Sequence, residues 1–310
     1  MANKYFAGVD IGGTNIRAAL FDSDGKVVTK SKASTGEDPM QVLFGLLETV
    51  YDSNARNIAG IGVAVAGLID RSSGVVMRSP NIPKLNSVNL KSEIGKRYKT
   101  HIVVENDANA AAYGEKISGA GKNIGNFVMF TLGTGIGGGI VFHDKLLHVA
   151  AEIGHMSINA GGRQCPCGNV GCLELYASAT AIIGNTVAEL EKGGSSILRD
   201  FNNGNFYKVM AEDIYKAALE GDPLARNVLR EAGKSLGIGI ANVINIMGPD
   251  AIILTGGLIG AWNIYIETAI KEASKRALKE LYNNVQIIAS TLGDDAGLIG
   301  AAHLVTNIKC

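Results

Sequence analysis

The chain has 310 residues, of which 46% are hydrophobic and 19% charged, so it carries enough apolar side chains for two folded domains and is not disordered. Lysine and arginine together number 29, as do aspartate and glutamate, which gives zero net charge and no chain-wide attraction for nucleic acid. No apolar stretch is long enough to span a bilayer, and no secretory signal is visible. We therefore expect a cytoplasmic protein that binds neither membranes nor nucleic acids.

The first half of the chain reads as strands joined by tight turns. The pattern predicts strands at 5–10, 16–22, 26–31, 58–65 and 101–104, with helices at 39–51 and from 108 onward. Two further strands, 127–132 and 136–142, repeat the opening device of a hairpin with a glycine-rich tip. We interpret 5–22 and 127–143 as an internal structural repeat of two related domains.

The second half is richer in helix. The pattern predicts helices at 173–190, 211–219, 223–247, 262–281 and 296–306, strands at 251–254 and 285–289, and a polar loop at 193–204. Strands that alternate with helices indicate an α/β fold with mixed sheets.

Three of the four cysteines lie within eight residues, and His155 precedes the first of them by ten. Cys165, Cys167 and Cys172 with His155 form a complete tetrahedral ligand set, which predicts a structural zinc site without an open position. Gly168 and Gly171 would let the backbone fold back so that the sulfurs converge. The alternative, a set of unrelated structural cysteines, stays open because the histidine lies outside the cysteine run. We expect the fourth cysteine, Cys310, to be an incidental free thiol.

The two glycine-rich turns are Gly12-Gly13-Thr14 and Gly133-Thr134-Gly135. A dinucleotide-binding loop would open a helix, whereas a strand is predicted to follow the second turn, so a Rossmann site is disfavoured. Successive backbone N–H groups at such tips can form an anion-binding nest for phosphate. A tight turn without a ligand remains the alternative for each tip.

The segment Glu105-Asn-Asp-Ala-Asn109 follows a strand and opens a helix. The macrodipole of the helix would stabilise an ionised aspartate at this position, Asp107. Simple capping of the helix by Asn106 or Asp107 is the alternative.

Five motifs of the chain resemble the ROK family of sugar kinases and repressors, and look most like its glucokinase branch. They are Asp10-Ile-Gly-Gly-Thr14, Glu105-Asn-Asp-Ala-Asn109, Leu132-Gly-Thr-Gly-Ile-Gly-Gly138, Glu152-Ile-Gly-His155 and Cys165-Pro-Cys-Gly-Asn-Val-Gly-Cys-Leu-Glu174. The order and spacing match over essentially the whole chain. The resemblance implies an actin-like, hexokinase-type fold of two α/β domains with the active site in the cleft between them. We expect a smaller domain at 1–118, onto which the helix at about 296–310 packs back, and a larger domain with the zinc site at 119–295.

The resemblance also implies roles for individual residues. Asp107 would be the base that takes the proton from the sugar hydroxyl, and Asp10 would lie near the Mg²⁺–phosphate group. ATP would be bound by Gly12, Gly13, Thr14, Gly133, Thr134, Gly135, Gly256 and Gly257. The sugar would be bound by Asn81, Asn106, Asp107, Glu152, His155 and Glu174. One ring nitrogen of His155 would bind zinc while the other faces the sugar.

The implied activity is transfer of the ATP γ-phosphate to the 6-hydroxyl of glucose, and relatives suggest a homodimer. N-acetylglucosamine, N-acetylmannosamine, mannose and allose remain alternative substrates. A sugar-sensing repressor is disfavoured because a strand is expected from Tyr5, which leaves no room for a helix-turn-helix, and a non-catalytic sugar-binding module is disfavoured by Asp107. Many relatives carry lysine where this chain has Asn15, which weakens any expectation of a cationic phosphate contact there.

Overall fold

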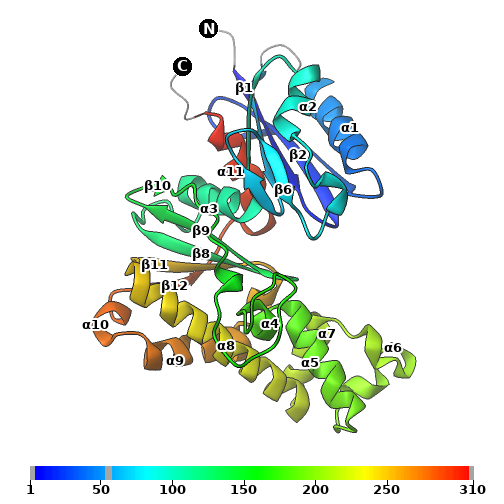
Figure 1. Cartoon of the computed structure of the whole chain (residues 1–310), viewed down its shortest axis with the longest axis vertical. Coiled ribbons are helices and arrows are strands. Elements are labelled where there is room, and N and C mark those ends of the chain that lie inside the picture. Colours follow the sequence, from blue (N-terminus) through cyan, green and yellow to red (C-terminus); the bar gives the residue numbers. More distant parts are fainter. Residues whose placement is uncertain (1–3, 53–57, 307–310) are drawn as a thin grey trace. The chain divides into compact units, whose positions relative to one another are not determined.

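The computed structural model describes residues 4–52 and 58–306, so Cys310 lies outside the described residues (Figure 1). The chain divides into two compact units. Unit 1 comprises residues 1–125, 139–150 and 290–310, and unit 2 comprises 126–138 and 151–289. Within the described residues, no helix combines the length and the apolar character needed to cross a membrane.

The sheet of unit 1 has five strands in the order β3-β2-β1-β4-β7. Its members are β1 (Tyr5–Ile11), β2 (Asn15–Phe21), β3 (Val27–Ser34), β4 (Ile58–Val65) and β7 (His101–Asn106). β1 pairs with β2 antiparallel and with β4 parallel, and β4 pairs with β7 parallel. The carboxyl ends of β1, β4 and β7 therefore meet at one edge, where Asp10 and Asp107 are found.

Alternation along the strands sends apolar side chains to both faces of this sheet. Ala18 and Leu20 pack in the cluster that includes α1 (Pro39–Asp52) and α2 (Leu90–Arg97), whereas Ala19 and Phe21 contact α11 (Ala296–Leu304). α11 lies so close to the strands that a Cβ on Gly62 would come within 1.8 Å of the Ala301 carbonyl oxygen. α3 (Asp107–Ser118) packs against α11 in the same unit.

Short elements complete unit 1. They are β5 (Leu68–Asp70), β6 (Val75–Arg78), the 3₁₀ turns at Pro83–Leu85 and Gly293–Asp295, and β10 (Lys145–Leu146). The sequence pattern missed β5, β6, β10 and α2, each of which is too short to show a clear period.

The second sheet has the order β10-β9-β8-β11-β12. Its other strands are β8 (Phe127–Leu132), β9 (Ile136–Phe142), β11 (Ala251–Thr255) and β12 (Gln286–Ala289). This order matches that of the first sheet strand for strand, which confirms the predicted internal repeat.

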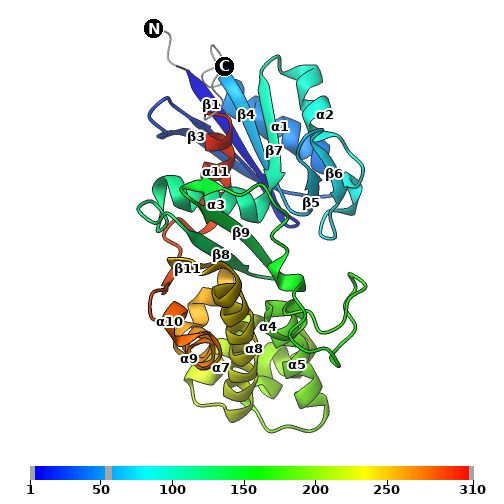
Figure 2. The ribbon, with the colours of Figure 1, turned by 60° about the vertical axis from the view of Figure 1, so that its left-hand side comes forward.

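The helices of unit 2 are arranged around one long central helix (Figure 2). They are α4 (Glu174–Ala177), α5 (Ala179–Glu191), α7 (Ala211–Leu219), α8 (Pro223–Met247), α9 (Glu267–Arg276) and α10 (Lys279–Tyr282). α8 contacts α5, α7 and α9. α8 has the bounds that the sequence predicted. The Asp222 side chain caps it, and Gly248 ends it at φ 52°.

Two predicted helices are interrupted. The helix expected at 173–190 is two helices, because Ser178 adopts an extended conformation and its hydroxyl caps α5. The helix expected at 262–281 is a π-helical turn (Trp262–Ile266) followed by α9 and α10, which are separated by the extended Ala277. The predicted loop at 193–204 contains a 3₁₀ turn (Ile197–Asp200) and the short helix α6 (Phe201–Gly204).

Candidate active site and metal centre

Asp107 is the first residue of α3 and directly follows β7. Asn106 is the N-cap of the helix, since its Oδ1 accepts hydrogen bonds from the N–H groups of Ala108 (2.9 Å) and Asn109 (3.1 Å). Its Nδ2 donates to the Gly67 carbonyl oxygen at 3.0 Å, and the Asn106 side chain also hydrogen-bonds Asp107, which opposes the rise in the pKa of Asp107. Capping, the alternative left open by the sequence, is thus performed by Asn106, and it fixes the backbone that presents Asp107.

Two acidic side chains of unit 1 that the sequence singled out, Asp10 and Asp107, both have perturbed pKa values. Burial raises the pKa of Asp107 above its ordinary value, against the opposing hydrogen bond from the Ala108 N–H. Burial, reinforced by the negative charge of Asp107, raises the pKa of Asp10 to about 7, while the Arg17 guanidinium opposes this shift. Carboxylates with perturbed pKa values in one place are typical of a functional site.

The first glycine tip adjoins this pair. The Gly12 N–H donates to the Asn15 carbonyl at 3.0 Å, and the Thr35 hydroxyl donates to the Gly12 carbonyl at 2.7 Å. A Cβ on Gly13 would lie 3.0 Å from the Cβ of Asn81. Unit 1 therefore brings together Asp10, Gly12, Gly13, Thr14, Asn81, Asn106 and Asp107.

The second glycine tip lies at the start of α5 in unit 2. The N–H of Ala179 donates to the Gly133 carbonyl at 2.9 Å, and the Thr180 hydroxyl donates to the Thr134 carbonyl at 2.8 Å. A Cβ on Gly135 would lie 3.0 Å from Oε2 of Glu174, which brings a predicted sugar-binding carboxylate next to a predicted phosphate loop.

Gly256 and Gly257 follow β11, the strand beside β8. Gly256 has φ 96°, and a Cβ there would lie 2.4 Å from the Leu132 carbonyl oxygen. A side chain is thus excluded at this position for both conformational and steric reasons.

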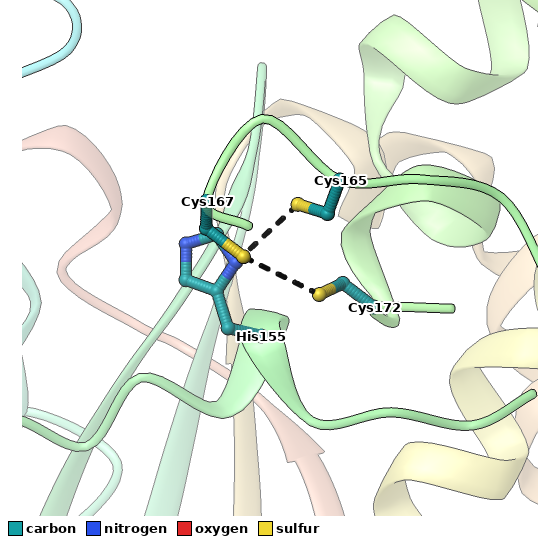
Figure 3. A group of neighbouring side chains, drawn as sticks. All are labelled: His155, Cys165, Cys167 and Cys172. Carbon is teal, nitrogen blue, oxygen red and sulfur yellow. Dashed lines mark hydrogen bonds between the residues drawn. The ribbon is translucent and has the colours of Figure 1, made fainter. Parts of the chain in front are cut away.

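His155, Cys165, Cys167 and Cys172 converge on one point, with one ligand atom from each lying within 4.8 Å of the others (Figure 3). The Sγ atoms of Cys167 and Cys172 are 3.7 Å apart, and Cys165 Sγ is 3.8 Å from Nδ1 of His155. A tetrahedron with metal–sulfur bonds of about 2.3 Å has edges of about 3.8 Å, so the donor set fits zinc.

The backbone of the cysteine loop is built for this convergence. Gly168 and Gly171 have φ values of 99° and 72°, and a Cβ on Gly171 would lie 1.8 Å from the Asn159 carbonyl oxygen. Burial raises the pKa of the Cys165 thiol above its ordinary value. Burial also raises the pKa of the Cys172 thiol, to about 12, whereas the Asn169 N–H lowers the pKa of Cys167. A bound cation would favour all three thiolates.

The predicted sugar-binding residues of unit 2 adjoin this metal centre. Nδ1 of His155 also lies 3.3 Å from Oε1 of Glu174, the first residue of α4. Since Nδ1 faces the cysteines, Nε2 is the ring nitrogen left to face a sugar. Glu152 precedes the 3₁₀ turn Ile153–His155 as its N-cap residue.

Sequence reasoning missed a buried ionic network around Glu105, the last residue but one of β7. Its carboxylate pairs with Arg71 (Nε, 2.9 Å) and contacts Nδ1 of His148 at 3.2 Å. It also accepts hydrogen bonds from the Asn109 side-chain amide at 3.2 Å and from the Asn106 backbone N–H at 3.0 Å. Burial pushes the pKa of Glu105 upward, but these partners hold it below its ordinary value. The available signal was a carboxylate within an otherwise buried strand.

The candidate residues fall into two sets, one in each unit. Unit 2 contains Gly133, Thr134, Gly135, Glu152, His155, Cys165, Cys167, Cys172, Glu174, Gly256 and Gly257. A single site drawn from both sets remains a prediction.

Two matching sheets, each with helices on its faces, define an actin-like ATPase fold. The family model of the ROK family matches residues 6–308, and the chain belongs to this family. It is 35% identical over 307 residues to a glucokinase of Thermotoga maritima, covering 96% of both chains. It is also 32% identical to a xylose repressor of Bacillus subtilis, covering 97% of this chain and 77% of the repressor.

The solved structure of a ROK family glucokinase from Streptomyces griseus, in complex with glucose and AMPPNP, is similar throughout. Its TM-score is 0.81 at 33% identity, and the match covers 97% of this chain and 98% of that one. The family and fold predicted from the motifs are therefore confirmed.

Proposed function

We propose that the chain is an ATP-dependent hexose kinase that transfers the γ-phosphate of ATP to the 6-hydroxyl of glucose. The observation that carries the proposal is the placement of Asp107 on the first turn of α3, in the same unit as Asp10 and the 12–14 tip. The glucokinase names of its relatives support the choice of reaction.

In the proposed reaction, Asp107 orients the 6-hydroxyl and accepts its proton. The sugar oxygen forms a bond to the γ-phosphorus, the bond from that phosphorus to the β–γ bridging oxygen breaks, and ADP leaves. Because the transition state of phosphoryl transfer is loose, positioning and charge neutralisation do most of the work. The raised pKa of Asp107 makes it a better proton acceptor than an exposed aspartate.

The phosphates would be held by backbone N–H groups and a magnesium ion. The two tips Gly12-Gly13-Thr14 and Gly133-Thr134-Gly135 would supply N–H groups other than those of Gly12 and Gly133, which already donate to the carbonyls of Asn15 and Gly135. Gly256 and Gly257 would border the adenosine. Oxygen donors suit Mg²⁺, so the Asp10 carboxylate is its candidate partner. The magnesium would neutralise charge on the phosphates when bound.

The sugar hydroxyls would be bound by Asn81, Asn106, Glu152, His155 and Glu174. The Cys₃His set would hold zinc through Cys165, Cys167, Cys172 and His155, and would fix the orientation of the imidazole. Four protein ligands would leave zinc no open position, so its contribution would be to position His155 beside Glu174. We also propose a cytoplasmic location, where thiols stay reduced, and a homodimeric assembly.

A sugar sensor without kinase activity is the second candidate, because the xylose repressor of Bacillus subtilis matches almost the whole of this chain. A coupled assay of ADP release with a panel of hexoses separates the two. We expect ADP release that depends on glucose more than on mannose, allose, N-acetylglucosamine or N-acetylmannosamine. Binding of a hexose without ADP release would favour the sensor, and preference for another hexose would correct the substrate.

A further inference from the structure

Glu105 connects the β7–α3 junction, which carries Asn106 and Asp107, with the segment 148–150, which precedes Glu152. Its side chain is 5% exposed, and it is the residue before Asn106 and Asp107. One carboxylate oxygen, Oε1, accepts hydrogen bonds from the Asn106 N–H at 3.0 Å and from the Asn109 amide at 3.2 Å. The carboxylate thus holds the junction from which Asp107 projects.

The other oxygen, Oε2, contacts a guanidinium and an imidazole from elsewhere in the unit. Arg71 Nε is 2.9 Å away and His148 Nδ1 is 3.2 Å away, and both side chains are about 40% exposed. Arg71 follows β5, whereas His148 follows β10. Three segments that are far apart in the sequence therefore meet on one buried carboxylate.

Asn109 binds the same segment a second time. Its amide also donates to the Val149 carbonyl at 2.9 Å, so residues 148 and 149 are both tied to the β7–α3 junction. Glu152, a predicted sugar ligand, follows three residues later in the chain. The position of this segment therefore depends on the group that also fixes the backbone next to Asp107.

We propose that Glu105 is a positioning residue of the reaction, which holds Asp107 and the segment 148–150 in register through Asn106, Asn109 and His148. The inference rests on the proposed kinase function. A buried carboxylate with four donors serves this purpose better than an amide, because glutamine would turn an N–H group toward donors and leave the Arg71 charge uncompensated.

Glu105→Gln is the direct test, measured by steady-state kinetics at varied hexose and varied ATP. Since misplacement of a reacting group by about 1 Å can cost about 100-fold, we expect kcat to fall between about 10- and 100-fold. The hexose KM should rise several-fold, while the ATP KM changes less than twofold. This split between kinetic constants would not follow from a general loss of stability.

Glu115→Gln is the matched control, because Glu115 is a fully buried carboxylate of α3, the helix that directly follows β7. It accepts hydrogen bonds from the Ser290 hydroxyl and the Leu292 N–H, and no predicted site residue is among its partners. We expect a similar loss of thermal stability but a kcat within twofold of wild type. If both variants lose the same fraction of kcat, the positioning role is wrong.

A double-mutant cycle tests whether His148 acts through Glu105. His148→Ala alone should raise the hexose KM several-fold, and the Glu105→Gln/His148→Ala double variant should be no worse than Glu105→Gln. Fully additive effects would overturn the proposal. If Glu105→Gln does not fold, the test rests on His148→Ala alone, because the His148 side chain is partly exposed and its removal should not prevent folding. Wild-type kinetic constants in His148→Ala would then refute the positioning role of Glu105.

Hydrogen exchange separates this inference from the proposed function. If the wild-type protein releases no ADP with any hexose, the kinase proposal fails. Glu105→Gln should still accelerate amide exchange at 148–152 by tenfold or more without affecting α8. Unchanged exchange at 148–152 would overturn the positioning role itself.

Discussion

Asp10 and Arg17 lie opposite each other on the antiparallel strands β1 and β2, with Oδ2 of Asp10 3.7 Å from Nη1 of Arg17. The guanidinium does not neutralise Asp10 fully, because Arg17 also binds the carboxylate and the carbonyl of Asp294. The net result of burial and of the Asp107 charge is an Asp10 pKa of about 7. Such a carboxylate destabilises the ligand-free protein when it ionises.

Asp10→Asn should therefore stabilise the ligand-free protein above neutral pH. Because the folded pKa is raised, Asp10 contributes stability that is present below pH 4 and is lost as the pH rises through about 7. Each pKa unit corresponds to about 1.4 kcal/mol, so the loss is on the order of a few kcal/mol. Thermal unfolding at pH 8 should show a higher Tm for the variant, with a smaller difference at pH 5 and impaired catalysis. A lower Tm at pH 8 would contradict the assignment.

Gly135→Ala should weaken sugar binding more than it slows turnover. The new Cβ would lie 3.0 Å from Oε2 of Glu174, so this carboxylate must shift by a few tenths of an ångström. The loss of one hydrogen bond to the sugar would raise the hexose KM by about tenfold. Gly184→Ala on α5, where a Cβ meets no atom within 4 Å, is the matched control and should leave the KM unchanged.

Cys167→Ser should lose zinc and the order of the sugar site. Metal content, measured by mass spectrometry, should fall from one zinc per chain to a small fraction. A stability loss of about 2–3 kcal/mol would lower the Tm by roughly 5–10 °C. Cys310→Ser, a substitution of the cysteine outside the cluster, should retain the metal. Full activity in zinc-free protein would show that the metal does not position His155.

The sequence was most informative where chemistry dictated the spacing of residues. Gly168 and Gly171 stand where the chain requires positive φ, and the Cys₃His donors converge as their spacing suggested. The repeated hairpin predicted two related sheets, and the two sheets have the same strand order. Each glycine-rich tip joins two strands that could be recognised in the sequence.

The remainder depended on contacts that a single sequence does not show. The helical spacing of apolar residues continues across Ser178 and across Ala277, so the sequence predicts one helix at each place. In the structure the backbone of each of these residues is extended, and the helix is divided there. The Glu105 network joins Arg71 and His148, which are separated by 77 positions in the sequence, so no local motif announces it.

The most direct test of the account is the transfer of labelled γ-phosphate from ATP to glucose in a single turnover, by the wild-type protein and by Asp107→Asn. The wild type should place the label on the 6-oxygen of glucose. The variant, which keeps the shape of the side chain but not its basicity, should transfer it about 10²–10⁴-fold more slowly while still binding glucose in calorimetry. Transfer at the wild-type rate by Asp107→Asn would contradict the role of Asp107, and no transfer by the wild-type protein would contradict the kinase function.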